Sequence, residues 1–281
     1  MNAVPTRGTT PESPASPPRV LAIAGSDSGG GAGIQADLKT MLALGVHGMT
    51  VITAVTAQNT LGVTAWEPVP TDLVVAQIEA VAGDIGVEAV KTGMLATAAI
   101  VEAVAAAIEG LDLPQVVVDP VMVAKGGDRL LVEEAIATVK AELLRHAMVV
   151  TPNIPEAEVL ADTTVRTVGD MRAAARRIHA LGARVVVIKG GHLDGPESID
   201  VVCTPDRMFE ITGPRIPGRH THGTGCTFAA AIAANLALGQ SVETAVEEAR
   251  RYLEGALRHA PGIGNGHGPL NHFWRGTPYT S

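Results

Sequence analysis

Short runs rich in Val and Ile alternate along this chain with longer amphipathic or Ala-rich segments. This alternation is typical of β-α-β units, in which a helix connects two parallel strands. Hydrophobic residues make up 46% of the chain and aromatic residues only 2%, so the core has to be built from Val, Ala, Leu and Ile. Such residues usually fill a buried parallel sheet that is flanked by helices. The sequence therefore predicts an α/β fold.

The 281 residues are enough for one α/β domain with a single extended core. The predicted strands are 20–24, 49–56, 89–91, 116–118, 148–150 and 185–189, with an edge hairpin at 198–203 and 207–211. The predicted helices are 34–44, 71–82, 97–108, 133–144, 168–181, 224–238 and 242–259. Residues 1–18 are rich in Pro, Ser and Thr and lack an apolar stretch, so we expect a disordered tail before a folded domain over 19–281.

Charge and cysteine content argue against several classes of partner. The formal net charge is −8, and Lys and Arg form no basic run. We expect no nucleic-acid partner, because few aromatic residues are available to stack on bases, and no membrane span, because no uninterrupted apolar run reaches roughly 18 residues. The two cysteines, Cys203 and Cys226, form no paired framework, and neither HExxH nor CxxC occurs. The reducing cytoplasm is therefore the expected compartment, and a zinc site is not expected.

The loop after the first predicted strand is rich in glycine but matches neither common phosphate loop. Residues 24–37 read AGSDSGGGAGIQAD, which is not GxGxxG, and the GxxxxG beginning at Gly25 is followed by Gly31 instead of Lys. A nucleotide dehydrogenase and a P-loop kinase are thus disfavoured. In an open α/β sheet the ligand crevice lies beyond the carboxyl ends of the strands, so chemistry is expected just after each strand.

The segment RHTHGTGCTF, residues 219–228, places a glycine turn directly before an apolar helix. Gly223 and Gly225 permit a tight loop in which backbone amides point one way, and the helix adds its positive dipole end. The pattern predicts an anion hole, in which Cys226 would have a lowered thiolate pKa. In the competing interpretation the turn only caps a core helix, and Cys226 is a small buried hydrophobe.

Three other strand ends carry groups suited to phosphate and magnesium. Asp119 follows the fourth strand, Asn153 and Glu156 follow the fifth, and Lys189 ends the sixth. Oxygen ligands at this spacing suit a Mg²⁺ ion that keeps several waters and bridges phosphates. Lys189 is placed to neutralise a phosphoryl group in transfer. Glu156 has an alternative interpretation as an acid in the first turn of a helix, where the dipole favours it.

The second strand and the first helix carry candidates for ring recognition. Gln58 presents a donor and an acceptor together, which suits a heteroaromatic ring, although it is also interpretable as a loop amide that caps its own backbone. Asp37 is placed to accept a hydrogen bond from a substrate amine or hydroxyl, or else is a solvated helical acid. Met94 is placed to lie over a flat ring, and Lys91 is interpreted as a strand-end charge.

The order of these motifs closely resembles the hydroxymethylpyrimidine/phosphomethylpyrimidine kinases of the ribokinase-like superfamily, over about residues 20–275. The motifs that carry the resemblance are AGSDSGGGAGIQADLKT, TAQNTLGV, KTGML, VDPVMVAKGG, TPNIPEAE, IKGGH and THGTGC. The resemblance implies a three-layer α/β/α sandwich with a mostly parallel sheet, no large lid, and a homodimer. It also implies ATP-dependent phosphorylation of 4-amino-5-hydroxymethyl-2-methylpyrimidine, and then of its monophosphate to the diphosphate, in thiamine biosynthesis.

The resemblance assigns the ring-binding residues by motif. It implies that Gln58 and Asp37 recognise the pyrimidine and that Gly25, Met94 and Val121 line its pocket. Thr56 departs from the family pattern, since we expect an aliphatic residue beside the ring.

The transfer residues are assigned in the same way. The resemblance implies that Glu156 organises Mg²⁺ through water with help from Asp119, and that Lys189, Thr224 and Asn153 bind ATP. It further implies that Cys226 assists deprotonation of the hydroxymethyl group, and that the amides of residues 223–226, including Gly223 and Gly225, stabilise the phosphoryl oxygens.

Two other functions compete with this one. A pyridoxine or pyridoxal kinase of the same superfamily shares the glycine loop, NxxE and a GTGC-like turn. In relatives that prefer pyridoxal the residue matching Gln58 tends to be Met, so the amide favours an aminopyrimidine. A binding or regulatory module without turnover is disfavoured because Lys189, Glu156 and Cys226 are all present.

Overall fold

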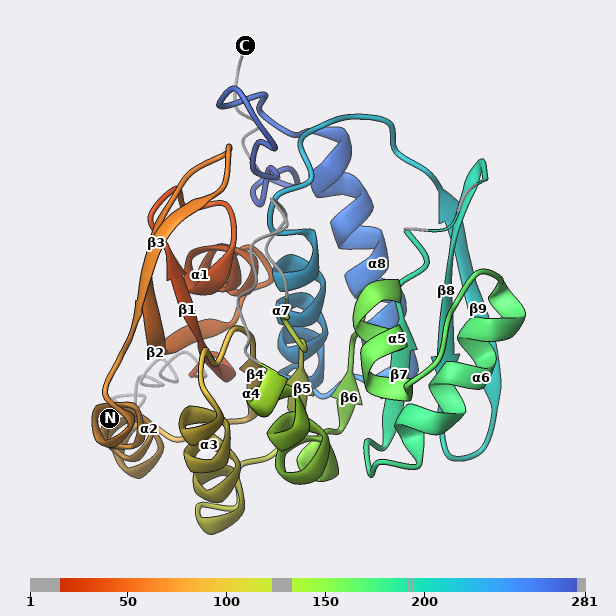
Figure 1. The fold of residues 1–281 in the computed structure, drawn as a ribbon. Helices are drawn as coiled ribbons and strands as arrows, with labels where there is room; N and C mark the ends of the chain where they lie inside the picture. Colours follow the sequence, from red (N-terminus) through yellow and green to blue (C-terminus); the bar gives the residue numbers. More distant parts are fainter. Residues whose placement is uncertain (1–15, 123–132, 192, 194, 277–281) are drawn as a thin grey trace, which may run out of the picture.

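The computed structural model describes residues 16–122, 133–191, 193 and 195–276, which form one nine-stranded sheet between two layers of helices (Figure 1). The strand order is β3-β2-β1-β4-β5-β6-β7-β8-β9. The strands are β1 (Arg19–Asp27), β2 (His47–Gln58), β3 (Val63–Pro68), β4 (Ala89–Thr92), β5 (Val116–Val118), β6 (Val149–Val150), β7 (Val185–Ile188), β8 (Glu197–Cys203) and β9 (Met208–Pro214). The run from β2 to β7 is parallel, while β3, β8 and β9 pair antiparallel at the two edges.

The helices divide between the two faces of the sheet. One face is covered by α1 (Gly33–Ala43), α7 (Thr224–Ala237) and α8 (Val242–Arg258). The other face is covered by α2 (Thr71–Asp84), α3 (Ala98–Gly110), α4 (Glu133–Thr138), α5 (Ile154–Ala161) and α6 (Val168–His179). The predicted three-layer α/β/α sandwich with a mostly parallel sheet is confirmed, and the described residues include no large lid domain.

The two-residue period of β1 explains why both faces are apolar. Leu21 and Ile23 pack into the core on the α2–α6 face, whereas Val20 and Ala22 pack against the helices of the other face. All four side chains are fully buried. Successive strand side chains point to opposite faces, so a strand covered on both sides has to be apolar at every position.

Three elements differ from the sequence-based prediction. Strand β3 was not predicted, because its sequence VTAWEP lacks the Val- and Ile-rich run of the core strands, and none of its residues is buried. Helix α5 was not predicted either, since it has only eight residues and begins with Pro155 in its first turn. The predicted helix 133–144 is α-helical only to Thr138, and continues as a π turn to Leu143 and a 3₁₀ turn to His146.

Pro18, the last residue of the predicted tail, is hydrogen-bonded to the sheet. The carbonyl oxygen of Pro18 accepts a hydrogen bond from the amide of His47 at 2.8 Å, at the amino end of β1. Residues 1–15 of the predicted tail lie outside the described residues. Across the described ranges, no helix combines the length and the apolar character that crossing a membrane requires.

Candidate active site

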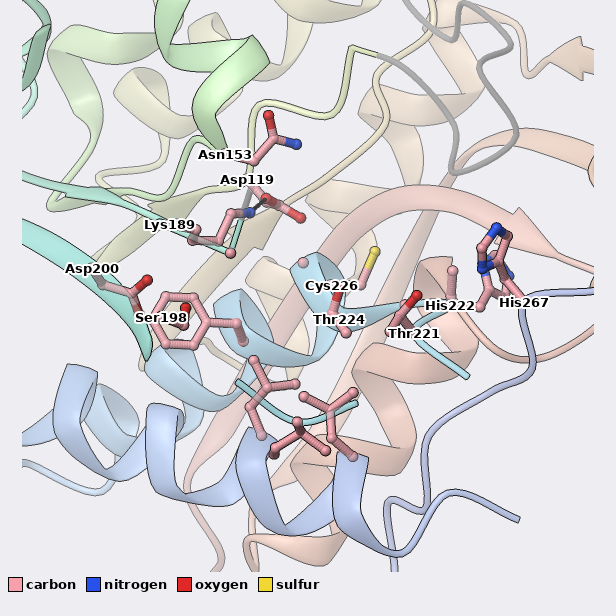
Figure 2. A pocket seen from close by; sticks show the side chains of 18 of the residues that line it. Asp119, Asn153, Lys189, Ser198, Asp200, Thr221, His222, Thr224, Cys226 and His267 are labelled. Atoms are coloured by element: carbon pink, nitrogen blue, oxygen red, sulfur yellow. Dashed lines mark hydrogen bonds and ion pairs between the residues drawn. The ribbon is translucent and has the colours of Figure 1, made fainter. Parts of the chain in front are cut away.

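A cavity of about 900 Å³ opens beyond the carboxyl ends of the parallel strands (Figure 2). It brings together most of the predicted site residues. Those that line it are Gln58, Asp119, Val121, Asn153, Glu156, Lys189, Gly223, Thr224, Gly225 and Cys226. Gly25 and Met94 lie just behind its lining, and Asp37 is buried beneath it.

The turn before α7 has the geometry of an anion site. Gly223 has φ +80°, and a Cβ at this position would overlap the carbonyl oxygen of Gly31. The first i→i−4 bond of α7 runs from the amide of Thr227 to the carbonyl of Gly223 at 2.9 Å. The amides of Gly225 and Cys226 therefore lie at the open end of the helix, where the dipole is positive.

Lys189 and Asp119 form an ion pair over this helix end. Nζ of Lys189 lies 3.1 Å from Oδ1 of Asp119, whose side chain is only 2% exposed (Figure 2). A Cβ on Gly225 would lie 3.3 Å from Nζ of Lys189, so the glycine leaves room for the ammonium group beside the helix amides. Burial lowers the pKa of Lys189, but Asp119 and Glu156 outweigh it and raise that pKa above its ordinary value. Lys189 is therefore a permanent cation at the anion site.

Asn153 and Glu156 form a capping box at the start of α5. The Asn153 side chain accepts from the amide of Glu156 at 3.0 Å, and Oε2 of Glu156 accepts from the amide of Asn153 at 2.8 Å. The competing interpretation of Glu156 as a first-turn acid is thus realised in the fold. Burial raises the pKa of Glu156 to about 7, with Lys189 lowering it and Asp119 raising it.

The carboxyl groups of Asp119 and Glu156 determine which metal ion fits the site. Among the described residues, no cluster of three or more His, Cys, Asp or Glu side chains has metal-binding geometry. Asp119 is close enough to Glu156 for its carboxylate to raise the pKa of Glu156. Two carboxylates beside an anion site fit a Mg²⁺ ion that keeps most of its waters and shares phosphate oxygens, and do not fit a fully protein-caged ion.

The prediction of a lowered thiolate pKa for Cys226 is wrong. Burial raises the pKa of the Cys226 thiol to about 11. The buried cation Lys91 and the amide of Gly33 lower that pKa, but the carboxylates of Asp37 and Asp119 raise it further. Desolvation disfavours the charged thiolate more than the helix end stabilises it, so the unliganded chain carries a thiol at neutral pH.

Asp37 has a partner within the chain. Its Oδ2 accepts from Nζ of Lys91 at 2.8 Å, and both side chains are 0% exposed. Burial raises the pKa of Asp37 to about 6, while the carboxylates near Lys91 hold the lysine pKa above its ordinary value against burial. The two interpretations of Asp37 as a solvated acid and of Lys91 as a simple strand-end charge are therefore wrong. Oδ1 of Asp37 has no hydrogen-bond partner among the described residues.

The predicted ring residues gather on one side of the cavity. Met94 and Ala54 form a small buried cluster, against which Val121 and Trp66 pack. A Cβ on Gly25 would lie 3.1 Å from the Met94 sulfur, so the backbone of β1 approaches this cluster closely. Val121 lines the cavity together with Gln58 at the end of β2, and the buried cluster packs behind Val121.

Several residues of the site were not identified from the sequence. Asp27 ends β1 and accepts from the amides of Gly29, Gly31 and Ala32 at 2.8, 2.9 and 2.8 Å. Nε2 of His222 lies 2.9 Å from Oδ2 of the same carboxylate. Burial raises the pKa of Asp27, but the hydrogen bonds from His222 and the loop amides outweigh it and lower that pKa. The available signal was an Asp at the start of a glycine loop, a position where its carboxylate caps backbone amides.

The far end of the cavity is also missing from the sequence-based prediction. It is lined by apolar side chains from α7, α8 and the segment before the GTGC turn, namely Ile216, Pro217, Phe228, Leu253 and Leu257. These residues are scattered over two helices and a loop, so no local motif marks them.

Comparison with known proteins identifies the family. The model of the phosphomethylpyrimidine kinase family matches residues 27–271. The hydroxymethylpyrimidine/phosphomethylpyrimidine kinase of Streptomyces coelicolor is 52% identical over 267 residues, covering 95% of this chain and 98% of that protein.

Two solved structures extend the likeness to three dimensions. An ADP complex of Bacillus subtilis pyridoxal kinase has a TM-score of 0.86 at 40% identity, covering 92% of this chain and 98% of the other. A phosphomethylpyrimidine kinase from Clostridium difficile has a TM-score of 0.77 at 41% identity, covering 85% and 99%. With a family match over most of its length and this ribokinase-like architecture, the chain belongs to the phosphomethylpyrimidine kinase family.

Proposed function

We propose that the chain transfers the γ-phosphoryl group of ATP to the hydroxymethyl group of 4-amino-5-hydroxymethyl-2-methylpyrimidine, and then phosphorylates the monophosphate to the diphosphate. The observation that carries this proposal is one cavity that joins the anion site at the start of α7 to the apolar side chain of Val121 beside the amide of Gln58. The first feature suits a phosphoryl group and the second a neutral heteroaromatic ring. Relatives about 50% identical carry the same activity in their names. The place of the reaction is thiamine biosynthesis.

At the phosphate end, the chain supplies charge stabilisation. The amides of Gly225 and Cys226 and the ammonium group of Lys189 face the position where negative charge accumulates on the phosphoryl oxygens. Asp119 and Glu156 would hold Mg²⁺ through water, and the ion, when bound, would neutralise ATP phosphate oxygens. Thr224 and Asn153 border the same space. The apolar far end of the cavity, around Phe228 and Leu257, suits the adenine ring.

In this proposal Cys226 receives the proton of the hydroxymethyl group as a thiolate, after its thiol has lost its own proton to solvent. With a pKa of about 11, the unliganded thiol is almost fully protonated at neutral pH. Substrate binding therefore has to lower this pKa, and the cations Lys91 and Lys189 both favour the thiolate. The ion pair with Asp37 fixes Lys91 beneath the thiol.

Pyridoxal is the second candidate substrate, because the Bacillus subtilis pyridoxal kinase shares the fold at a TM-score of 0.86. Gln58 favours the aminopyrimidine, since an amide matches a ring nitrogen beside an exocyclic amine. We also propose a cytoplasmic homodimer, as the resemblance implies. Light scattering on the purified chain tests the dimer.

Product analysis tests the proposed function directly. The purified chain is incubated with Mg·ATP and the pyrimidine alcohol, and mass spectrometry separates monophosphate from diphosphate. We expect the monophosphate first and the diphosphate later, with little product from the Lys189→Ala variant. A parallel reaction with pyridoxal measures the second candidate. ATP turnover with pyridoxal alone would assign the chain to the second function, and no turnover with either substrate would refute both.

A further inference from the structure

We infer that Thr56 and the His222–Asp27 pair are positioning residues, which fix the side-chain amide of Gln58 with its NH₂ group toward Thr56 and its oxygen toward His222. The inference rests on the proposed role of Gln58 as the ring-recognising residue. It goes further because it states which end of the amide meets which atom of the ring. In the structure, the Gln58 amide makes two mismatched contacts, one with Thr56 and one with His222, and a half-turn of the amide removes both.

The first conflict is at Thr56, whose side chain is buried and lies on β2 two residues before Gln58. Its hydroxyl donates to the carbonyl oxygen of Ser26 at 2.7 Å, and a carbonyl oxygen can only accept. The hydroxyl has one hydrogen, so only its lone pairs remain for Gln58. The structure places Oε1 of Gln58 3.1 Å from this hydroxyl oxygen, so an acceptor faces an acceptor.

The second conflict is at His222. Nε2 of this ring lies 2.9 Å from Oδ2 of Asp27, which also accepts from the amides of Gly31 and Ala32. These bonds keep the pKa of the carboxyl low, so Asp27 is an ionised acceptor and Nε2 of His222 has to carry a hydrogen. Nε2 of Gln58 lies 3.4 Å from the same ring nitrogen, so a donor faces a donor.

One half-turn of the Gln58 amide about its last torsion resolves both conflicts. The nitrogen and oxygen of a primary amide are nearly the same size, so they exchange places with little change in packing. After the exchange, the NH₂ group donates to the Thr56 hydroxyl, and the oxygen shares the hydrogen of His222 Nε2 with Asp27. The partly buried side chain of Gln58 gains two matched contacts and loses two mismatched ones.

The amide orientation then sets how a ring binds. The second N–H of Gln58 is available on the Thr56 side of the pocket, and a lone pair of the oxygen is available on the His222 side. A ligand edge with a ring nitrogen beside an exocyclic amine fits only one way: the ring nitrogen faces the Thr56 side and the amine faces the His222 side. The network thus spans three separate segments, the end of β1, the end of β2 and the turn before α7.

Nuclear magnetic resonance of the unliganded protein tests the orientation without any turnover. The side-chain NH₂ signal of Gln58 is assigned by its absence in the Gln58→Met variant. We expect nuclear Overhauser contacts from this NH₂ group to the methyl group of Thr56. Contacts to the ring protons of His222 in their place would overturn the inference. This result does not depend on the proposed function, so a failure of the kinase assay leaves it intact.

Binding measurements test the ring assignment. The Thr56→Val variant keeps the shape of the side chain but loses the hydroxyl, and Thr56→Ser is the matched control that keeps it. For the pyrimidine alcohol, we expect Thr56→Val to bind about 2- to 10-fold more weakly than wild type by calorimetry. The Thr56→Ser variant should keep most of the wild-type affinity. For an analogue with C–H in place of the ring nitrogen beside the amine, the two variants should bind about equally. Equal losses for both ligands would show a merely structural role and overturn the assignment.

Discussion

The two ends of the cavity that meet at Cys226 are built from different chemistry. The phosphate end carries the cation Lys189, the carboxyl groups of Asp119 and Glu156, and the amino end of α7. The ring end is lined by Val121 and by the neutral amide of Gln58, with the apolar cluster around Met94 packed behind Val121. Electrostatic stabilisation is strong but indifferent to the shape of the acceptor, whereas a buried amide penalises a ring that leaves it unpaired. The difference assigns rate to one end and selectivity to the other.

The boundary between the two ends is a buried charged layer. Lys91 and Asp37 lie beneath the cavity at 0% exposure, and Lys91 affects the charge of Cys226 from below. A change at Cys226 should alter turnover for every substrate, while a change at Gln58 should alter the ratio between substrates.

Cys226→Ala is expected to have the largest effect. If Cys226 receives the hydroxymethyl proton, its loss should lower kcat by roughly 100- to 10,000-fold for both the pyrimidine alcohol and pyridoxal. Stability should change little, because the substitution removes only one small sulfur atom beside the cavity. Steady-state kinetics and thermal unfolding measure the two quantities. Cys203→Ala is the matched control; equal kinetic behaviour of the two variants would make Cys226 a structural residue.

Gln58→Met should act on selectivity. Methionine cannot pair with the ring nitrogen and amine of the aminopyrimidine, a loss of about 1 to 3 kcal/mol that corresponds to roughly 5- to 150-fold in kcat/KM. Pyridoxal lacks that amine and should lose little or gain. Both substrates are assayed with wild type and variant under the same Mg·ATP. A ratio that does not move toward pyridoxal would remove Gln58 as the selectivity residue and break the division between the two ends.

Glu156→Gln tests the raised pKa of Glu156 at the phosphate end through the pH dependence of stability. The pKa of Glu156 is raised from 4.5 to about 7 in the folded chain. Between these values the folded state binds more protons than the unfolded state, so this residue's contribution to stability is present below pH 4.5 and is lost as pH rises through about 7. The glutamine can keep the capping contact with the Asn153 amide.

Denaturant unfolding at pH 5 and pH 8 without metal measures this effect. The free energy of unfolding of Glu156→Gln minus that of wild type should be larger at pH 8 than at pH 5, by at most about 3 kcal/mol. Added Mg²⁺ should reduce the difference by stabilising the wild type alone. A difference between the proteins that is the same at both pH values would contradict the raised pKa.

Shortening the chain at its beginning is expected to have the smallest effect. Pro18 lies at the amino end of β1, at the opposite end of that strand from the cavity. Deleting residues 1–15 should leave turnover and selectivity unchanged. Deleting 1–18 also removes the Pro18 carbonyl that accepts from His47, at a cost of about 0.5 to 1.5 kcal/mol in the free energy of unfolding. A large loss of turnover on the shorter deletion would show that the segment acts on one end of the site.

The sequence by itself determined the layered α/β fold and most of the candidate site. The Val-rich runs, such as 116–118 and 185–188, are apolar at every position because both faces of the sheet are covered, and this pattern indicates a parallel sheet. The carboxyl ends of those strands meet at one edge, so Asp119 and Lys189 were expected together and are 3.1 Å apart. Strand β3 was not predicted because none of its residues is buried, and helix α5 was not predicted because it has only eight residues.

Only the tertiary structure decided the charge states and the orientations. The GTGC motif predicted the free helix amides before α7 but gave the wrong direction for the pKa of Cys226, because burial and the carboxylates of Asp37 and Asp119 come from distant parts of the chain. Asp37 and Lys91, 54 positions apart, became an ion pair only through the contact of α1 with β4. The orientation of Gln58 depends on His222, which is 164 positions away. A local pattern specifies which groups are present, whereas solvation and hydrogen-bond direction depend on neighbours that folding supplies.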